Sequence, residues 1–162
     1  MQMIKPPTKL PHWATIYDPV LFLGGSIEMG AATDWQDRII AALEDENVLI
    51  LNPRRDHWDS SWEHTPTLGT PFYDQVTWEL DAQEHLADIL VYYFDPNTKS
   101  PITLLELGMF MSAKEDIHVY CPKEFWRYGN IKIACHRSNV EVHENETSLI
   151  EAVRNSIKER EE

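Results

Sequence analysis

The chain has 162 residues, of which 43% are apolar and 25% charged, and these values fit one domain with a sizeable core. The formal net charge of −13 disfavours a long polyanionic partner such as duplex DNA, because no basic face can be found along the chain, although a small anionic ligand is still possible. No apolar run approaches the roughly eighteen residues of a membrane span, and the start lacks a signal-peptide core. We therefore expect a cytoplasmic protein with no nucleic-acid or membrane partner.

An extended arm and a strand that ends at glycines are expected at the beginning of the chain. Residues 1–19 contain several prolines and predict an N-terminal arm, within which residues 13–17 can form an edge strand. The apolar run at residues 20–23 stops abruptly at the Gly-Gly-Ser segment 24–26, as a buried parallel strand does before a tight loop.

A helix, a second strand and a long loop follow. Thr33 and Gln36 have the spacing of a capping box and predict a helix that continues to residue 43. A second buried strand is expected at residues 48–51. The loop from there to about residue 72 contains two tryptophans and two histidines, which favour an ordered lid over a disordered segment.

The second half of the chain continues the alternation of strands and helices. We expect helices at residues 73–87, 100–110 and 147–158, strands at 89–94, 117–120, 131–135 and 140–142, and a loop or short helix at 122–130. This order predicts one α/β domain over residues 20–162, a Rossmann- or flavodoxin-like three-layer sandwich with a mainly parallel sheet of about five strands.

The segment at residues 100–110 contains one conspicuous residue, because Glu106 is the only charged residue between Lys99 and Lys114. Ser100 suits the N-cap of a helix and Pro101 suits its first position. A buried carboxylate is costly unless it is paired or its pKa rises. Glu106 is therefore either a tuned acid, base or nucleophile in a cleft, or a structural residue that bonds a neighbouring loop or reaches solvent.

The loops after the parallel strands should converge on one ligand crevice at the carboxyl edge of the sheet. Gly24, Gly25 and Ser26 can present N–H groups and a hydroxyl to a ribose or a phosphate, and Arg54 or Arg55 can clamp a phosphate. An ordinary tight turn and a solvated arginine pair explain the same residues equally well.

Two further acids have alternative interpretations. If Glu79 points into the same cleft as Glu106, the two carboxylates form a nucleophile and a proton-handling partner. Otherwise Glu79 lies on an exposed helix face. Asp95 follows a predicted strand and either binds a sugar hydroxyl or caps the turn.

Metal and cofactor chemistry is not expected. The potential ligands lack the close paired spacing of a zinc site, and the two cysteines are too few for a disulfide framework. No nucleophile-elbow motif supports acyl transfer by a serine. These potential ligands are Cys121, Cys135, His118 and His136.

Several short motifs together make the chain resemble the nucleoside 2-deoxyribosyltransferase family, particularly its compact bacterial and phage-associated branch. The resemblance covers most of residues 20–157 and depends on segments 22–27, 52–55, 78–79, 87–88 and, above all, Leu104-Leu105-Glu106-Leu107-Gly108. It implies that Glu106 is the nucleophile, that Glu79 or Asp81 assists it, and that Asn130 contributes across the subunit interface of a homodimer or higher homo-oligomer.

The resemblance further implies retaining chemistry on the N-glycosidic bond of a 2′-deoxynucleoside or its 5′-monophosphate, through a deoxyribosyl ester of Glu106 and without a cofactor or metal. The acceptor is a nucleobase in a transferase and water in an N-hydrolase. A non-catalytic nucleotide-binding or sensor domain is the alternative.

The chain departs from the family at residues 95–101, where the classical enzymes have a glycine-rich approach to the nucleophile. The aromatic residues available to stack on the base are Trp58, Trp62, Phe125 and Trp126.

Overall fold

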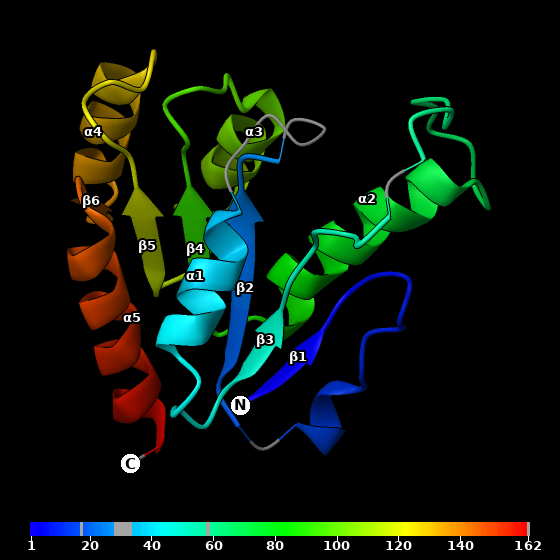
Figure 1. Cartoon of the computed structure of the whole chain (residues 1–162), viewed down its shortest axis with the longest axis horizontal. Coiled ribbons are helices and arrows are strands. Elements are labelled where there is room, and N and C mark those ends of the chain that lie inside the picture. Colours follow the sequence, from blue (N-terminus) through cyan, green and yellow to red (C-terminus); the bar gives the residue numbers. More distant parts are fainter. Residues whose placement is uncertain (17, 28–33, 58, 162) are drawn as a thin grey trace.

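The computed structural model describes residues 1–16, 18–27, 34–57 and 59–161, and Figure 1 shows their arrangement. Within these ranges the strands form one parallel sheet with the order β1-β3-β2-β4-β5-β6. The strands are β1 (Gln2–Ile4), β2 (Val20–Gly25), β3 (Leu49–Leu51), β4 (Ile89–Tyr93), β5 (Ile117–Tyr120) and β6 (Glu141–His143).

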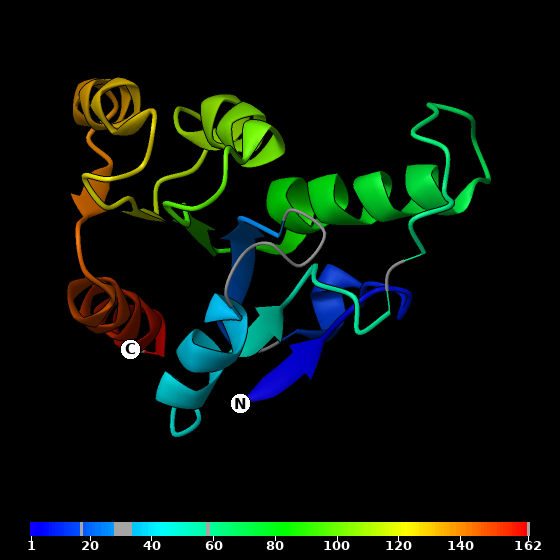
Figure 2. The same cartoon turned by 45° about the horizontal axis from the view of Figure 1, so that its top comes forward.

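Helices cover both faces of this sheet and make a three-layer sandwich, as predicted. Figure 2 shows α2, α3 and α4 on one face and α1 and α5 on the other. The helices are α1 (Trp35–Ala42), α2 (Pro71–Asp81), α3 (Pro101–Phe110), α4 (Tyr128–Arg137) and α5 (Glu146–Glu161), with a 3-10 turn at Trp13–Thr15 and a π-helical segment at Ala82–Leu86.

No helix in the described ranges has the length and apolar character needed to cross a bilayer.

Two hydrophobic cores fill the spaces between the layers, because alternate residues of each strand point to opposite faces. Phe22 and Tyr92 pack against α2 and α3, whereas Leu21 and Tyr93 pack against α1 and α5. Burial on both faces explains the continuous apolar runs of β2 and β4 in the sequence.

The chain reverses its direction of travel across the sheet at β2. From β2 it passes through α1 to β3 on one side, and from β3 it crosses through α2 to β4 on the other side. The carboxyl ends of β2 and β4 are therefore the switch point, where ligands bind in open α/β sheets. The strand ends meet directly there, since the Ser26 amide donates to the Tyr93 carbonyl oxygen at 2.9 Å.

Some expected elements are wrong. Residues 13–15 form a 3-10 turn in place of an edge strand, and Tyr17 lies outside the described residues. Residues 131–135 belong to α4, because Ile131 and Cys135 are one helical turn apart and both face the sheet. A short apolar run fits either a strand or a helix, and packing decides between them.

Other boundaries differ in detail. The sheet has six strands instead of about five, because Gln2–Ile4 of the expected arm pairs with β3. The helix expected at 73–87 becomes a π-helix after Asp81. Thr33 of the expected capping box lies outside the described residues, and Asp34 occupies the N-cap of α1.

Candidate active site

A cavity of about 750 Å³ opens at the carboxyl edge of β2 and β3. Residues 24–27, at the end of β2, and residues 52–56, which follow β3, form one part of its wall. Gln75 and Glu79 of α2 and the first turns of α3, as far as Glu106, form another. The expected convergence of strand-end loops therefore includes residues from α2 and α3.

Glu106 occupies the second turn of α3 and is only 7% exposed. The helix begins at Pro101, and the preceding Ser100 adopts a left-handed conformation with φ of 48°. Burial and the nearby charge of Glu79 raise the pKa of Glu106 to about 8, against the lowering effect of a hydrogen bond from Gln83. Glu106 is therefore protonated over a large part of the neutral pH range in the free protein.

Glu79 is half-buried on α2 and lines the same cavity. Its Oε1 accepts a hydrogen bond of 2.5 Å from Nε2 of Gln75, which also donates to the Pro53 carbonyl oxygen at 3.1 Å. Nε of Arg55 donates in turn to Oε1 of Gln75. Burial raises the pKa of Glu79 to about 7, and the Gln75 bond and the Arg55 charge limit this rise.

The two carboxyl groups line the same cavity, and the charge of Glu79 acts on Glu106. Because both pKa values are raised towards neutrality, the state with one carboxylate and one carboxylic acid is well populated near pH 7 to 8. Such a pair can supply a nucleophile and a proton donor at the same pH, which is the arrangement that two-carboxylate catalysis at a glycosidic carbon requires.

Hydroxyl groups cluster beside the start of α3. Oγ1 of Thr98 donates to Oγ of Ser26 at 2.9 Å and lies 2.8 Å from Oγ of Ser100, and the two serine hydroxyls are also hydrogen-bonded. Ser26 and Ser100 line the cavity. The first N–H groups of a helix have no intrahelical partner, so this end of the cavity is rich in donors.

The two glycines at the end of β2 let the strand pass close to aromatic rings. A Cβ atom on Gly25 would lie 2.6 Å from the Trp35 ring and 2.6 Å from the Tyr93 carbonyl oxygen. A Cβ atom on Gly24 would lie 3.0 Å from the Tyr92 ring. Both glycines line the cavity, and the packing around Gly25 alone already requires glycine there.

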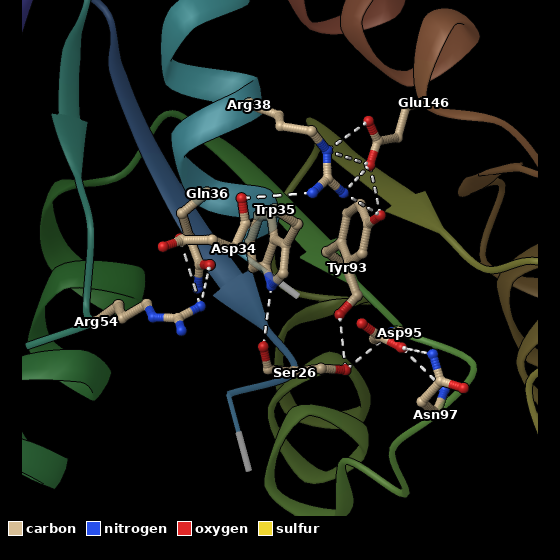
Figure 3. Close-up of polar contacts among 10 residues, drawn as sticks. All are labelled: Ser26, Asp34, Trp35, Gln36, Arg38, Arg54, Tyr93, Asp95, Asn97 and Glu146. Carbon is tan, nitrogen blue, oxygen red and sulfur yellow. Dashed lines mark hydrogen bonds and ion pairs between the residues drawn. The ribbon is translucent and has the colours of Figure 1, made fainter. Parts of the chain in front are cut away.

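Arg54 lines the cavity beside the start of α1. Figure 3 shows its Nη1 bonded to Oε1 of Gln36 at 3.2 Å and paired with Asp34 at 3.5 Å. In the same close-up, Nε1 of Trp35 donates to the Ser26 carbonyl oxygen. These contacts anchor the wall formed by α1 and the β2 loop.

Three candidate residues lie elsewhere. Asp81 is exposed at the end of α2, and Asn130 is exposed on α4, and neither lines the cavity of its own chain. Asp95 is buried, and its Oδ1 accepts bonds from the backbone and the side chain of Asn97, as a turn cap does. Trp58 lies outside the described residues.

The described residues contain no group of three or more His, Cys, Asp or Glu side chains placed to hold a metal ion. Cys121 and Cys135 are both buried as free thiols.

Two site residues, Gln75 and Gln83, were not singled out as candidates from the sequence. They flank Glu79 at helical spacing, and Gln75 donates to the Glu79 carboxylate while Gln83 donates to the Glu79 carbonyl oxygen. The signal was present as polar residues at i, i+4 and i+8. A polar row of this kind is more often a solvated face, so spacing alone does not identify it.

The fold and the cavity define an α/β protein with two glutamate carboxyl groups in a cavity at the carboxyl edge of a parallel sheet. Residues 18–125 match the family described as nucleoside 2-deoxyribosyltransferase like, and this range is about two thirds of the chain. The chain therefore belongs to that family, as its motifs predict. Comparison with curated proteins gives no match. Family membership supports a general function in nucleoside chemistry.

Proposed function

We propose that the protein is a cytoplasmic enzyme of nucleotide salvage that cleaves or exchanges the N-glycosidic bond of a 2′-deoxynucleoside or its 5′-monophosphate. The observation that carries this proposal is the placement of Glu106 and Glu79 in one cavity, with the pKa values of both carboxyl groups raised towards neutrality. Membership of the nucleoside 2-deoxyribosyltransferase-like family supplies the substrate class.

In the first step a carboxylate oxygen of Glu106 attacks C1′ of the deoxyribose. The C1′–N bond breaks, its electron pair passes to the nitrogen of the base, and Glu79 in its acid form donates the proton that neutralises the leaving base. In the second step an acceptor attacks C1′, its proton passes to Glu79, and the ester bond to Glu106 breaks. Two displacements retain the configuration at C1′.

The reactive protonation state has the proton on Glu79, whereas the free site prefers it on Glu106. The two pKa values, about 7 and about 8, lie close together, so this preference is small. Positive charge develops at C1′ as the base leaves and favours an ionised Glu106. A preference this small is readily reversed by the bound substrate.

The hydroxyl-rich end of the cavity fits the 5′ end of the substrate. Ser26 and Ser100 offer hydroxyl groups, the first turn of α3 offers N–H groups, and Arg54 offers a cation. A 5′-hydroxyl needs only the neutral donors, whereas a 5′-phosphate also uses Arg54. Loss of activity on monophosphates alone in Arg54→Ala would identify the nucleotide as substrate.

A homo-oligomer accounts for features of α3 and α4 that the single chain leaves unexplained. Ile102, Leu105 and Met109 are exposed at helical spacing on α3, where Ile102 also lines the cavity, and Ile133 is exposed on α4. A second copy on this face would cover them and would bring the partner's Asn130 near a neighbouring site. Molecular mass in solution, compared with that of Leu105→Glu, tests this arrangement.

The reaction is tested by incubating the protein with each deoxynucleoside and its 5′-monophosphate, with and without a free acceptor base. Release of base without an acceptor identifies a hydrolase, and formation of a new nucleoside only with an acceptor identifies a transferase. Mass spectrometry of the quenched protein should detect a deoxyribosyl adduct on Glu106. Saturable binding without turnover of any substrate would contradict the proposal and favour a sensor domain.

A further inference from the structure

Gln75 lies one helical turn before Glu79 on α2 and lines the same cavity. Its side chain is buried, and its Nε2 donates a hydrogen bond of 2.5 Å to Oε1 of Glu79. Residues four apart on a helix are neighbours, so α2 by itself brings the two side chains together. The Gln75 amide is therefore in direct contact with the carboxyl group that the proposed reaction uses as an acid.

The other bonds of the Gln75 amide fix its orientation. Nε2 also donates to the Pro53 carbonyl oxygen at 3.1 Å, and Oε1 accepts a bond from Nε of Arg55. A carbonyl oxygen can only accept a hydrogen bond and a guanidinium can only donate one. An amide turned the other way would lose both bonds, so the NH2 group is the end that faces Glu79.

Arg55 attaches this amide to the loop that follows β3. Its guanidinium carbon lies 4.9 Å from the centre of the Trp62 ring, in cation–π contact, while its Nε donates to Gln75. The Gln75 side chain is therefore held from outside α2 as well as by its own helix. Such outside support is what a side chain needs in order to keep a reacting group in one position.

The Gln75 bond distinguishes the two oxygens of the Glu79 carboxyl group. Oε1 accepts the amide N–H, whereas Oε2 has no hydrogen-bond partner among the residues that the structure describes. A carboxylic acid accepts a hydrogen bond better at its carbonyl oxygen than at its hydroxyl oxygen, so the acid form carries its proton on Oε2. Because Glu79 lines the cavity, Oε2 is the oxygen that a bound substrate can reach.

We propose that Gln75, held in place by Arg55, is a positioning residue that fixes the Glu79 carboxyl group so that Oε2 carries the proton to the leaving base. The inference rests on the proposed function of Glu79. As the C1′–N bond breaks, its electron pair passes to the base nitrogen, which takes the proton from Oε2 and leaves Glu79 ionised. The amide bond to an ionised carboxylate is stronger than the bond to the neutral acid, so Gln75 favours this transfer.

Other charged groups act on the same carboxyl group and must stay constant in a test. The positive charge of Arg55 lowers the pKa of Glu79, and Glu106 of α3 interacts with Glu79 electrostatically. The remaining charged side chains that line the cavity are Lys5, Asp34, Asp37, Arg54 and Asp56. Gln75→Met keeps the side chain similar in size, leaves all these charges in place and removes the hydrogen-bonding amide.

The kinetic test compares 2′-deoxyguanosine with 7-methyl-2′-deoxyguanosine, or the 5′-monophosphates of both, because the cationic methylated base leaves as a neutral molecule without an added proton. In Gln75→Met, kcat on the unmethylated substrate should fall about tenfold, with KM within about twofold of the wild-type value. On the methylated substrate kcat should stay within about twofold of the wild-type value. Equal losses on the two substrates would indicate a merely structural role and would overturn the proposal.

An NMR titration of the Glu79 carboxyl carbon gives a readout that needs no turnover. In protein labelled at glutamate Cδ, with the signal assigned from Glu79→Gln, the midpoint should rise by about one pH unit in Gln75→Met, because the bond to the ionised form is lost. In the wild-type protein the Gln75 NH2 protons should titrate with the Glu79 midpoint. This second measurement tests the contact even if Gln75→Met does not fold, and NH2 signals that ignore the Glu79 titration would overturn the proposal.

Val76→Met is the matched control, because it places the same side chain at an exposed position of the same helix. Both rates and the Glu79 midpoint should stay unchanged in this variant. An unchanged midpoint in Gln75→Met would overturn the positioning role even in an active enzyme. Absence of turnover by the wild-type protein on every deoxynucleoside and monophosphate would overturn the proposed function instead, while the titration would still report whether Gln75 holds Glu79.

Discussion

Two glutamates lie on opposite sides of β4, each linked to one of two adjacent tyrosines. Glu146 accepts a hydrogen bond of 2.5 Å from the Tyr93 hydroxyl and is held by the guanidinium of Arg38, as Figure 3 shows. These contacts lower the pKa of Glu146. Glu106 lies on the Tyr92 side with a neutral amide and a second glutamate beside it, and its pKa rises to about 8.

The difference is the one we expect between a structural carboxylate and the proposed reactive one in the same protein. A cation and a hydroxyl keep Glu146 ionised over the whole neutral range and tie α1 to α5. Within the described residues, no ion pair joins Glu106 to a basic side chain. Burial without a counter-charge leaves Glu106 able to gain and lose a proton near pH 7 to 8.

The largest expected effect is the loss of activity in Glu106→Gln. Removal of the proposed nucleophile should reduce kcat by about 10⁴-fold or more, because the neutral amide forms no ester with C1′. Release of base, followed by chromatography, measures this loss. Glu146→Gln is the matched control and should retain most of the wild-type rate; equal losses in the two variants would remove the distinction between the two glutamates.

Glu79→Gln should reduce kcat/KM by about 100-fold, because the leaving base loses its proton donor. The substitution also removes the negative charge that raises the pKa of Glu106. The acidic limb of the pH–rate profile should therefore shift to a lower pH than its wild-type position near pH 8. A pH–rate profile measured from pH 5 to 9 tests both effects. An upward shift of the limb would contradict the assigned interaction.

The dependence of stability on pH should distinguish the two sides of the sheet. The folded protein disfavours ionised Glu106 and Glu79, so their contribution to stability is complete below about pH 4.5 and is lost as pH rises to about 8. We expect the wild-type Tm to fall by about 5 °C or more between pH 5 and 8, and less in Glu106→Gln. Calorimetry across this range measures both slopes.

The smallest expected effect is that of Glu146→Gln on stability. Its pKa is lowered in the folded protein, so its contribution is present above the unfolded pKa and is lost as pH falls through the folded value, opposite in sign to that of Glu106. Arg38 is about half exposed, and solvent screening limits the ion pair to about 1 kcal/mol. Urea unfolding of Glu146→Gln and wild-type protein at pH 7 and at pH 3 should show a difference that shrinks at the lower pH.

Most of the architecture could be predicted from the sequence, because buried parallel strands are continuous apolar runs bounded by turn residues. The strands near residues 20–25, 49–51, 89–93 and 117–120 were confirmed for this reason. The strand predicted at residues 131–135 was wrong, because a segment of five residues is too short to show a decisive period. The strand at Gln2–Ile4 was missed, because an edge strand of three residues depends on its partner β3.

The sequence by itself determined that Glu106 is exceptional, since a lone charge in an apolar helix is visible without coordinates, and the adjacent motif indicates the family. Only the tertiary structure decided that Glu79 shares its cavity and that Asp95 caps a turn. The physical reason is that helical phase and packing set the direction in which each of these side chains points. A π segment after Asp81 and the crossing of β2 bring together residues whose spacing in the chain gives no sign of contact.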